Sequence, residues 1–135
     1  MVTKRKKGAD RRLRPLTVSA SFKSFVMEQL EELGDVTPRS MFGGVGLYHR
    51  ETFFGIIARD VLYLKVDGTN RADYERADMP PFQPYRGRSA TMQYYAVPVD
   101  VLESAAELAV WARKAVAAGE AGASRPHRGP PLKRL

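Results

Sequence analysis

The sequence contains no cysteine among its 135 residues, which excludes disulfide bonds, thiolate catalysis and zinc sites with cysteine ligands. Its two histidines are His49, in a predicted turn, and His127, in a predicted tail, so we predict no catalytic or metal-binding role for either. No apolar run approaches the length of a membrane span or follows the basic N-terminus as in a signal peptide. We therefore expect a cytoplasmic protein without a membrane partner, a metal or a cofactor.

The residues that are present have the composition of an ordinary globular protein, with 44% hydrophobic and 27% charged side chains. The length suits one compact domain. The formal net charge of +7 is unevenly spread along the chain. Residues 1–16 hold a net +6 and residues 119–135 a net +3, which leaves residues 17–118 slightly acidic, at −2.

Both ends have few apolar residues, and the last is rich in proline, glycine and arginine. We predict a disordered basic tail over residues 1–16, a folded domain over 17–118 and a flexible Pro/Arg tail over 119–135. The tails are interpreted as solvated ends, and the alternative is a weak, sequence-independent contact with nucleic acid. The candidate residues for that contact are Lys4, Arg5, Lys6, Lys7, Arg11, Arg12 and Arg14.

Hydrophobic periodicity predicts a helix at each end of the folded part. The first begins at Ser19 or Ser21 and ends near Gly34. The last begins with a capping box formed by Ser104 and Glu107 and ends at Gly119. The residues predicted for its inner face are Ala105, Leu108, Ala109, Ala112, Ala115 and Val116, with Trp111 at the edge.

Between these helices the sequence predicts strands and one short helix. Strand-like runs over residues 40–48, 53–59 and 61–66 are separated by short turns, which favours a three-stranded antiparallel meander. A short helix follows over residues 70–77, and two further strands are expected near 82–86 and 91–97. The predicted fold class is α+β, in the order helix, three-stranded meander, helix, two strands, helix.

A cluster of glycines lies inside the first strand-like run. Glycine in a strand costs roughly 0.5–1 kcal/mol relative to alanine, so a bare backbone must serve a purpose here. We interpret the cluster as structural, through close helix-on-strand packing or a bulge. A phosphate-cradling loop is the alternative, although no helix follows the glycines. The residues concerned are Met41, Phe42, Gly43, Gly44 and Gly46.

A second cluster joins a predicted strand end to a predicted helix start. Lys65, Asp67, Asn70 and Arg71 form a candidate site for an anion or a partner. In the simpler interpretation, Asp67 caps the helix and the cations are solvated.

Three tyrosines also suggest base stacking on a sheet. They are Tyr85, Tyr94 and Tyr95, each on a predicted strand. Because Tyr94 and Tyr95 are adjacent in one strand, they face opposite sides of the sheet, and at most one can belong to a stacking surface.

An ordered series of motifs lies between Ser19 and Gly119: residues 39–48, Phe54-Gly55, residues 62–67, Asn70-Arg71, Pro81-Phe82, residues 92–95 and the segment around Trp111. Taken together, these motifs resemble the N-terminal domain of the TfoX/Sxy family. The resemblance implies an α+β fold similar to secretion-chaperone-like folds and no catalytic residues. It also implies a relation to bacterial regulators of natural competence, which are thought to act with the cyclic-AMP receptor protein at promoters.

We therefore predict a non-enzymatic, stand-alone TfoX-N-like module that acts through a protein partner. The expected partner class is transcription machinery, with weak nucleic-acid contact through the tails. The alternative is a chaperone-like or structural homodimer without a nucleic-acid role. Val110, predicted on the outer side of the last helix, and a free sheet edge motivate this alternative.

Overall fold

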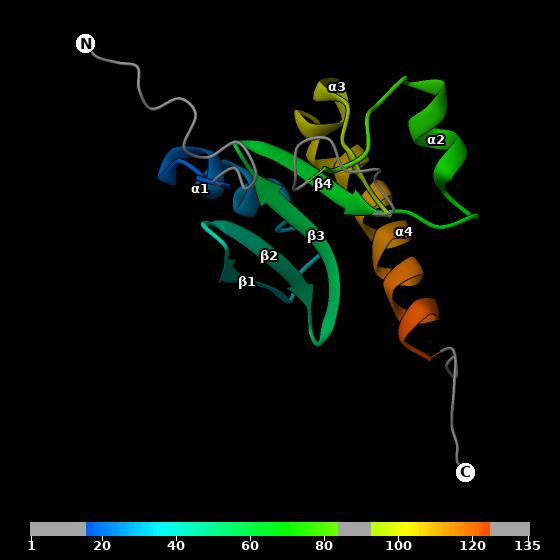
Figure 1. The fold of residues 1–135 in the computed structure, drawn as a ribbon, viewed down its shortest axis with the longest axis horizontal. Coiled ribbons are helices and arrows are strands. Elements are labelled where there is room, and N and C mark those ends of the chain that lie inside the picture. Colours follow the sequence, from blue (N-terminus) through cyan, green and yellow to red (C-terminus); the bar gives the residue numbers. More distant parts are fainter. Residues whose placement is uncertain (1–15, 84–92, 125–135) are drawn as a thin grey trace.

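The computed structural model describes residues 16–83 and 93–124, which form one antiparallel sheet and four helices. The sheet order is β1 (Val36–Met41), β2 (Gly44–His49), β3 (Thr52–Ala58), β4 (Val61–Lys65) and β5 (Tyr94–Ala96). The helices are α1 (Ala20–Gln29), α2 (Arg71–Arg76), α3 (Val99–Leu102) and α4 (Ala105–Ser124). The predicted α+β class is confirmed, and Figure 1 shows the strands laid side by side with α4 running behind β4.

The meander has four strands before α2, because the run over residues 40–48 is two strands and not one. Phe42 and Gly43 have φ values of 52° and 86°, and they turn the chain between β1 and β2. Positive φ at both central residues is the geometry of the tightest hairpin turns. The prediction that these residues lie inside a strand is wrong. The predicted turn at Arg59-Asp60 is confirmed, and its two residues have φ values of 50° and 59°.

The two strands predicted after α2 are shorter than expected. Phe82 and Gln83 lie in no strand, although Pro81 forms an isolated bridge with Tyr95. Residues 84–86 of that prediction, and residues 91–92 of the next, lie outside the described residues. Within the described residues the second strand is β5, and it pairs antiparallel with β4.

The predicted helix starts are confirmed at both ends of the domain, but the ends of the helices differ. Ser19 Oγ accepts a hydrogen bond from Phe22 N at 3.2 Å, and Ser104 Oγ accepts one from Glu107 N at 3.2 Å. α1 ends at Gln29, before Gly34, and α4 continues through Gly119 to Ser124. The first residues of the predicted C-terminal tail, 119–124, therefore belong to the last helix. Sequence reading also missed α3.

The sheet buries side chains on both faces. One core packs against the helices and includes Val26 of α1, Leu30 at the C-cap of α1, Leu47 and Leu64 of the sheet, and Leu108 of α4. A second, smaller cluster on the other face consists of Leu16, Ile56, Ala58, Phe82 and Tyr94. Leu16 is 5% exposed, so the last residue of the predicted tail 1–16 belongs to the folded domain.

A bulge in β3 decides which phenylalanine enters which core. Leu47 pairs with Gly55 and Tyr48 pairs with Phe53, so Phe54 is an extra residue between two register positions. Phe54 consequently joins the helix-side core, although strict alternation would place it on the face of Ile56. Phe53 remains on the opposite face.

Helix α4 crosses the start of β3 at a glycine. A Cβ atom on Gly119 would lie 2.8 Å from Phe53 O and 2.8 Å from Thr52 Cγ2, well inside van der Waals contact. The next glycine of the helix, Gly122, would place a Cβ atom in open space. The close approach of α4 to the strand therefore depends on Gly119 and not on Gly122.

We expect Gly119→Ala to lower the free energy of unfolding by about 1–3 kcal/mol, because the helix or the strand must shift to admit the methyl group. The same change at Gly122 should be neutral or stabilising by up to about 1 kcal/mol, because alanine favours the helix and meets nothing. Urea denaturation followed by circular dichroism measures both values. Equal effects of the two substitutions would contradict the packing role of Gly119.

Candidate functional site at the separation of β3 and β4

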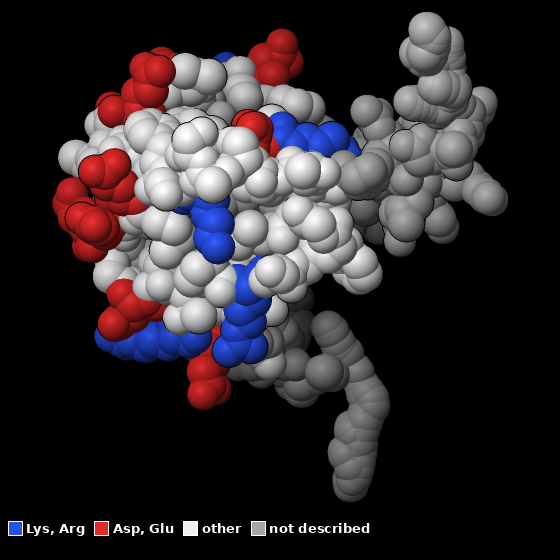
Figure 2. All heavy atoms as spheres, turned by 90° about the vertical axis from the view of Figure 1, so that its left-hand side faces the viewer, with Lys and Arg blue, Asp and Glu red and all other residues white. Residues whose placement is uncertain are grey.

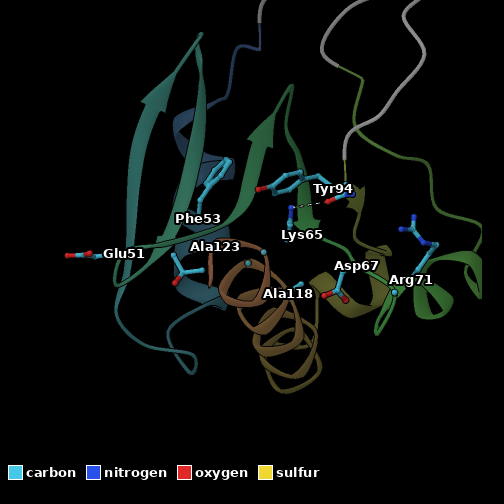
Figure 3. Close-up of a pocket in the computed structure, with 13 residues that line it drawn as sticks. Glu51, Phe53, Lys65, Asp67, Arg71, Tyr94, Ala118 and Ala123 are labelled. Carbon is cyan, nitrogen blue, oxygen red and sulfur yellow. Dashed lines mark hydrogen bonds between the residues drawn. The ribbon is translucent and has the colours of Figure 1, made fainter. Parts of the chain in front are cut away.

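A cavity of about 700 Å³, here called the fork cavity, lies where β3 and β4 separate. Pairing between these strands ends at Gly55 and Leu64, just before the bulge. Beyond that point Phe53 pairs with β2, whereas Lys65 pairs with Tyr94 of β5. The small residues on the C-terminal half of α4 close the cavity from the other side (Figure 3).

Aromatic rings form one wall of the fork cavity and continue across the sheet face away from the helices. The Phe53 ring centroid lies 5.4 Å from that of Tyr94 and 5.1 Å from that of Tyr48. Cations cover both ends of this row, with Lys65 Nζ 5.2 Å from the Tyr94 centroid and Arg39 Cζ 4.8 Å from the Tyr48 centroid. Burial, followed by the nearby Tyr48, raises the pKa of the Tyr94 phenol, which stays protonated at neutral pH.

Two cations of the predicted cluster, Lys65 and Arg71, line the cavity, and both are half-buried with neutral partners. Lys65 Nζ donates to Gln93 Oε1 at 3.2 Å, and Arg71 Nη1 donates to the Tyr95 hydroxyl at 3.3 Å. Within the described ranges, neither cation forms an ion pair with a carboxylate. Both side chains are also partly exposed, so the expectation that these cations are solvated stays a prediction.

Asn70 and Asp67 of the same cluster organise the turn before α2. Asn70 is 1% exposed, its Oδ1 accepts from Asp67 N at 2.8 Å, and its Nδ2 donates to Lys65 O at 3.1 Å. Asp67 Oδ1 accepts from Thr69 N at 2.9 Å and from Thr69 Oγ1 at 2.6 Å. Asn70 therefore fixes the end of β4 from the buried side, and it does not line the cavity.

The glycine cluster, including the strand residues Gly44 and Gly46, is packed against protein atoms. A Cβ atom on Gly44 would lie 2.7 Å from Ile57 O, and one on Gly46 would lie 3.0 Å from Met41 Sδ. Gly43 provides the turn conformation, and its neighbours are backbone atoms of Leu16. The expected close packing is thus made by an incoming coil segment and a neighbouring strand, and not by a helix.

Other predicted residues are placed apart from the fork cavity. Tyr94 and Tyr95 face opposite sides of the sheet, as expected, because they join different cores. His49 is the last residue of β2 and does not lie in the turn. Val110 is 48% exposed on α4, as predicted. The lysines and arginines of residues 1–16 that are candidates for nucleic-acid contact, together with Tyr85 and His127, lie outside the described residues.

The described surface shows no continuous basic patch on the face seen in Figure 2. Acidic side chains gather along one side of this face, whereas lysines and arginines stand apart from one another. Over residues 16–83 and 93–124, no helix has both the length and the apolar character needed to cross a membrane.

Comparison with known proteins identifies the family. The family model of the TfoX N-terminal domain matches residues 28–119, about two thirds of the chain. The chain belongs to the TfoX N-terminal domain family. The DNA transformation protein TfoX1 of Aliivibrio fischeri (strain ATCC 700601 / ES114) is 32% identical over 89 residues, which cover 59% of this chain and 43% of that protein. The chain thus matches less than half the length of this relative.

The region matched by the TfoX N-terminal family includes Phe53, Lys65, Arg71 and Tyr94 of the fork cavity, whereas Gly122 lies just beyond it. Sequence reading missed Phe53 and Gly122 as site residues. One sequence feature could have indicated Gly122. One glycine suffices to end a helix, so a second glycine three positions after Gly119 needs another explanation.

Asn70→Ala should lower the free energy of unfolding by about 1–3 kcal/mol, because Lys65 O and Asp67 N would lose a buried partner. Thr69→Ala is the matched control in the same turn, where an exposed hydroxyl is lost and a change below about 1 kcal/mol is expected. Urea denaturation measures both values. A loss at Asn70 no larger than that at Thr69 would contradict its role as the anchor of the turn.

Proposed function

We propose that this chain is a non-enzymatic regulatory module of the cytoplasm that acts through contact with a protein of the transcription machinery. The observation that carries the proposal is that the chain belongs to the TfoX N-terminal domain family. The 32% sequence identity to a DNA transformation protein over 89 residues supports it. Regulation of this kind needs a surface that recognises a partner and does not need a nucleophile, a base or a metal.

The tip of the β1–β2 hairpin supports a partner contact. Phe42 is 81% exposed and adopts a φ of 52°, a conformation that bulky residues rarely take. An exposed aromatic ring adds little to the stability of its own fold. A strained backbone conformation is commonly found where it serves recognition. We assign Phe42 as the main apolar contact to the partner.

A chimera tests this function. The segment of Aliivibrio fischeri TfoX1 that matches this chain is replaced by residues 16–124, and DNA transformation frequency is measured in a strain that lacks TfoX1. We expect the chimera to restore transformation and Phe42→Ala within it to lower the frequency by about tenfold or more, as loss of a central contact would. Val110→Ala, an equally simple truncation on α4, is the control and should have no effect. A chimera that accumulates normally and restores nothing would contradict the proposal.

The tails supply a separate, nonspecific contribution in this proposal. If the seven cations of residues 1–16 meet phosphates, the logarithm of the DNA association constant should fall with that of the salt concentration, with a slope of about −0.9 for each contact made. We expect deletion of residues 1–15, which keeps the buried Leu16, to reduce that slope and weaken binding to an arbitrary duplex, measured by fluorescence anisotropy. Unchanged DNA binding after the deletion would contradict a role of this tail in nucleic-acid contact.

A further inference from the structure

The fork cavity has the size and the lining of a site for a small molecule. Its volume of about 700 Å³ lies within the range of about 300–1,000 Å³ that is usual for ligand pockets. Polar groups and aromatic rings line it from β3, β4, β5 and α2, and small residues of α4 line the other side (Figure 3).

The charged groups on the cavity wall favour an anionic ligand. Lys65 and Arg71 are half-buried, and in the described part of the chain their hydrogen-bond partners are the neutral Gln93 amide and Tyr95 hydroxyl. A cation removed from bulk water is stabilised by an anion, and ammonium and guanidinium groups bind carboxylate and phosphate through charge-assisted hydrogen bonds. Lys65, which lies beside the Tyr94 ring, is placed to receive such a group, and Arg71 adds a positive charge elsewhere on the cavity lining.

The two acids on the wall have surroundings other than these two cations. Asp67 Oδ1 accepts two hydrogen bonds from Thr69 within its own turn. Glu51 is exposed, and in Figure 3 its carboxylate points away from the other labelled side chains. Neither acid forms an ion pair with Lys65 or Arg71 among the described residues.

The aromatic wall favours a ligand with a flat ring. Phe53 is half-buried and its ring contacts that of Tyr94, while Lys65 extends beside Tyr94 in Figure 3. A planar group placed against Phe53 would stack on an aromatic face while its anionic end met Lys65.

Gly122 keeps space open in the cavity. Glycine weakens a helix relative to alanine. Packing does not require a glycine at position 122, because a Cβ atom there would meet nothing within 4 Å. Gly119, three residues earlier, is required by contact with β3. The free volume at Gly122 therefore adds to the room available for a ligand on the α4 side.

We propose that the fork cavity binds a small organic anion that carries a planar ring, the chemistry shared by nucleotides and aromatic carboxylates. The anionic group meets Lys65, and the ring lies against Phe53 and Tyr94. This site is independent of the proposed contact at Phe42, and it is tested by binding to the purified full chain, without any measurement of transformation.

Four probes with a ring and two anions without one test which features of the ligand the cavity recognises. Titration calorimetry compares 2-naphthoate with the neutral 2-naphthamide, and uridine 5′-monophosphate with uridine, while acetate and inorganic phosphate carry charge without a ring. We expect at least one ringed anion to bind saturably and more tightly than its neutral counterpart and its ringless anion. The naphthoate and nucleotide arms distinguish the two sources. In ¹⁵N-resolved NMR spectra, the amides of Gly68 and Gly122 should shift on binding, and that of Gly34 should not.

Two variants with matched controls locate the site. Lys65→Met should weaken binding of the ringed anion by about tenfold or more, whereas Lys23→Met, which removes an exposed cation of α1, should not change it. Gly122→Leu should abolish binding by filling the cavity, whereas Ala121→Leu adds the same side chain at the neighbouring exposed position and should leave binding intact. Circular dichroism confirms that each variant is folded.

Three results would overturn the proposal. The first is that no ringed anion binds up to millimolar concentration. The second is that the neutral or ringless probes bind as tightly as the ringed anions. The third is that folded Lys65→Met and Gly122→Leu proteins both bind like the unmodified chain.

Discussion

The extra residue in β3 is the constraint on which the rest of this domain depends. Because Phe54 is inserted between the pairs Leu47–Gly55 and Tyr48–Phe53, both phenylalanines are packed, one in each core. The same insertion ends the β3–β4 ladder at Gly55 and Leu64. The separation of the strands, the row of rings on the sheet face away from the helices and the fork cavity all follow from this single irregularity.

Much of the fold could be predicted because local signals agreed with the tertiary structure. Ser19 and Ser104 cap their helices as their sequence positions suggest, and the alternation in β4 places Leu62 and Leu64 in the core. The prediction failed where the usual structural preference of a residue type differs from its role in this fold. Phe42 has no turn propensity, so the hairpin before β2 was hidden, and Gly119 ended the predicted helix although it serves close packing inside α4.

The candidate site was predictable only in part. Lys65, Asp67 and Arg71 stand close together in sequence, and the turn brings them to one cavity wall, so local reasoning found them. Phe53 and Tyr94 are 41 residues apart and meet only because the sheet order places β5 beside β4 and the bulge turns Phe53 toward it. Such a pair depends on strand register, which an alternating pattern does not specify by itself.

The proposed partner contact and the fork cavity lie at opposite ends of β2. Phe42 and Gly43 precede the first residue of that strand, whereas Glu51 to Phe53 follow its last residue, and six strand residues span about 20 Å. A protein held at the hairpin tip therefore need not cover the cavity. β2 joins the two places directly, and Gly44 and Gly46 within it are packed too tightly to accept a Cβ atom without displacement of their neighbours. These two glycines thus lie on the strand that separates the two proposed binding surfaces.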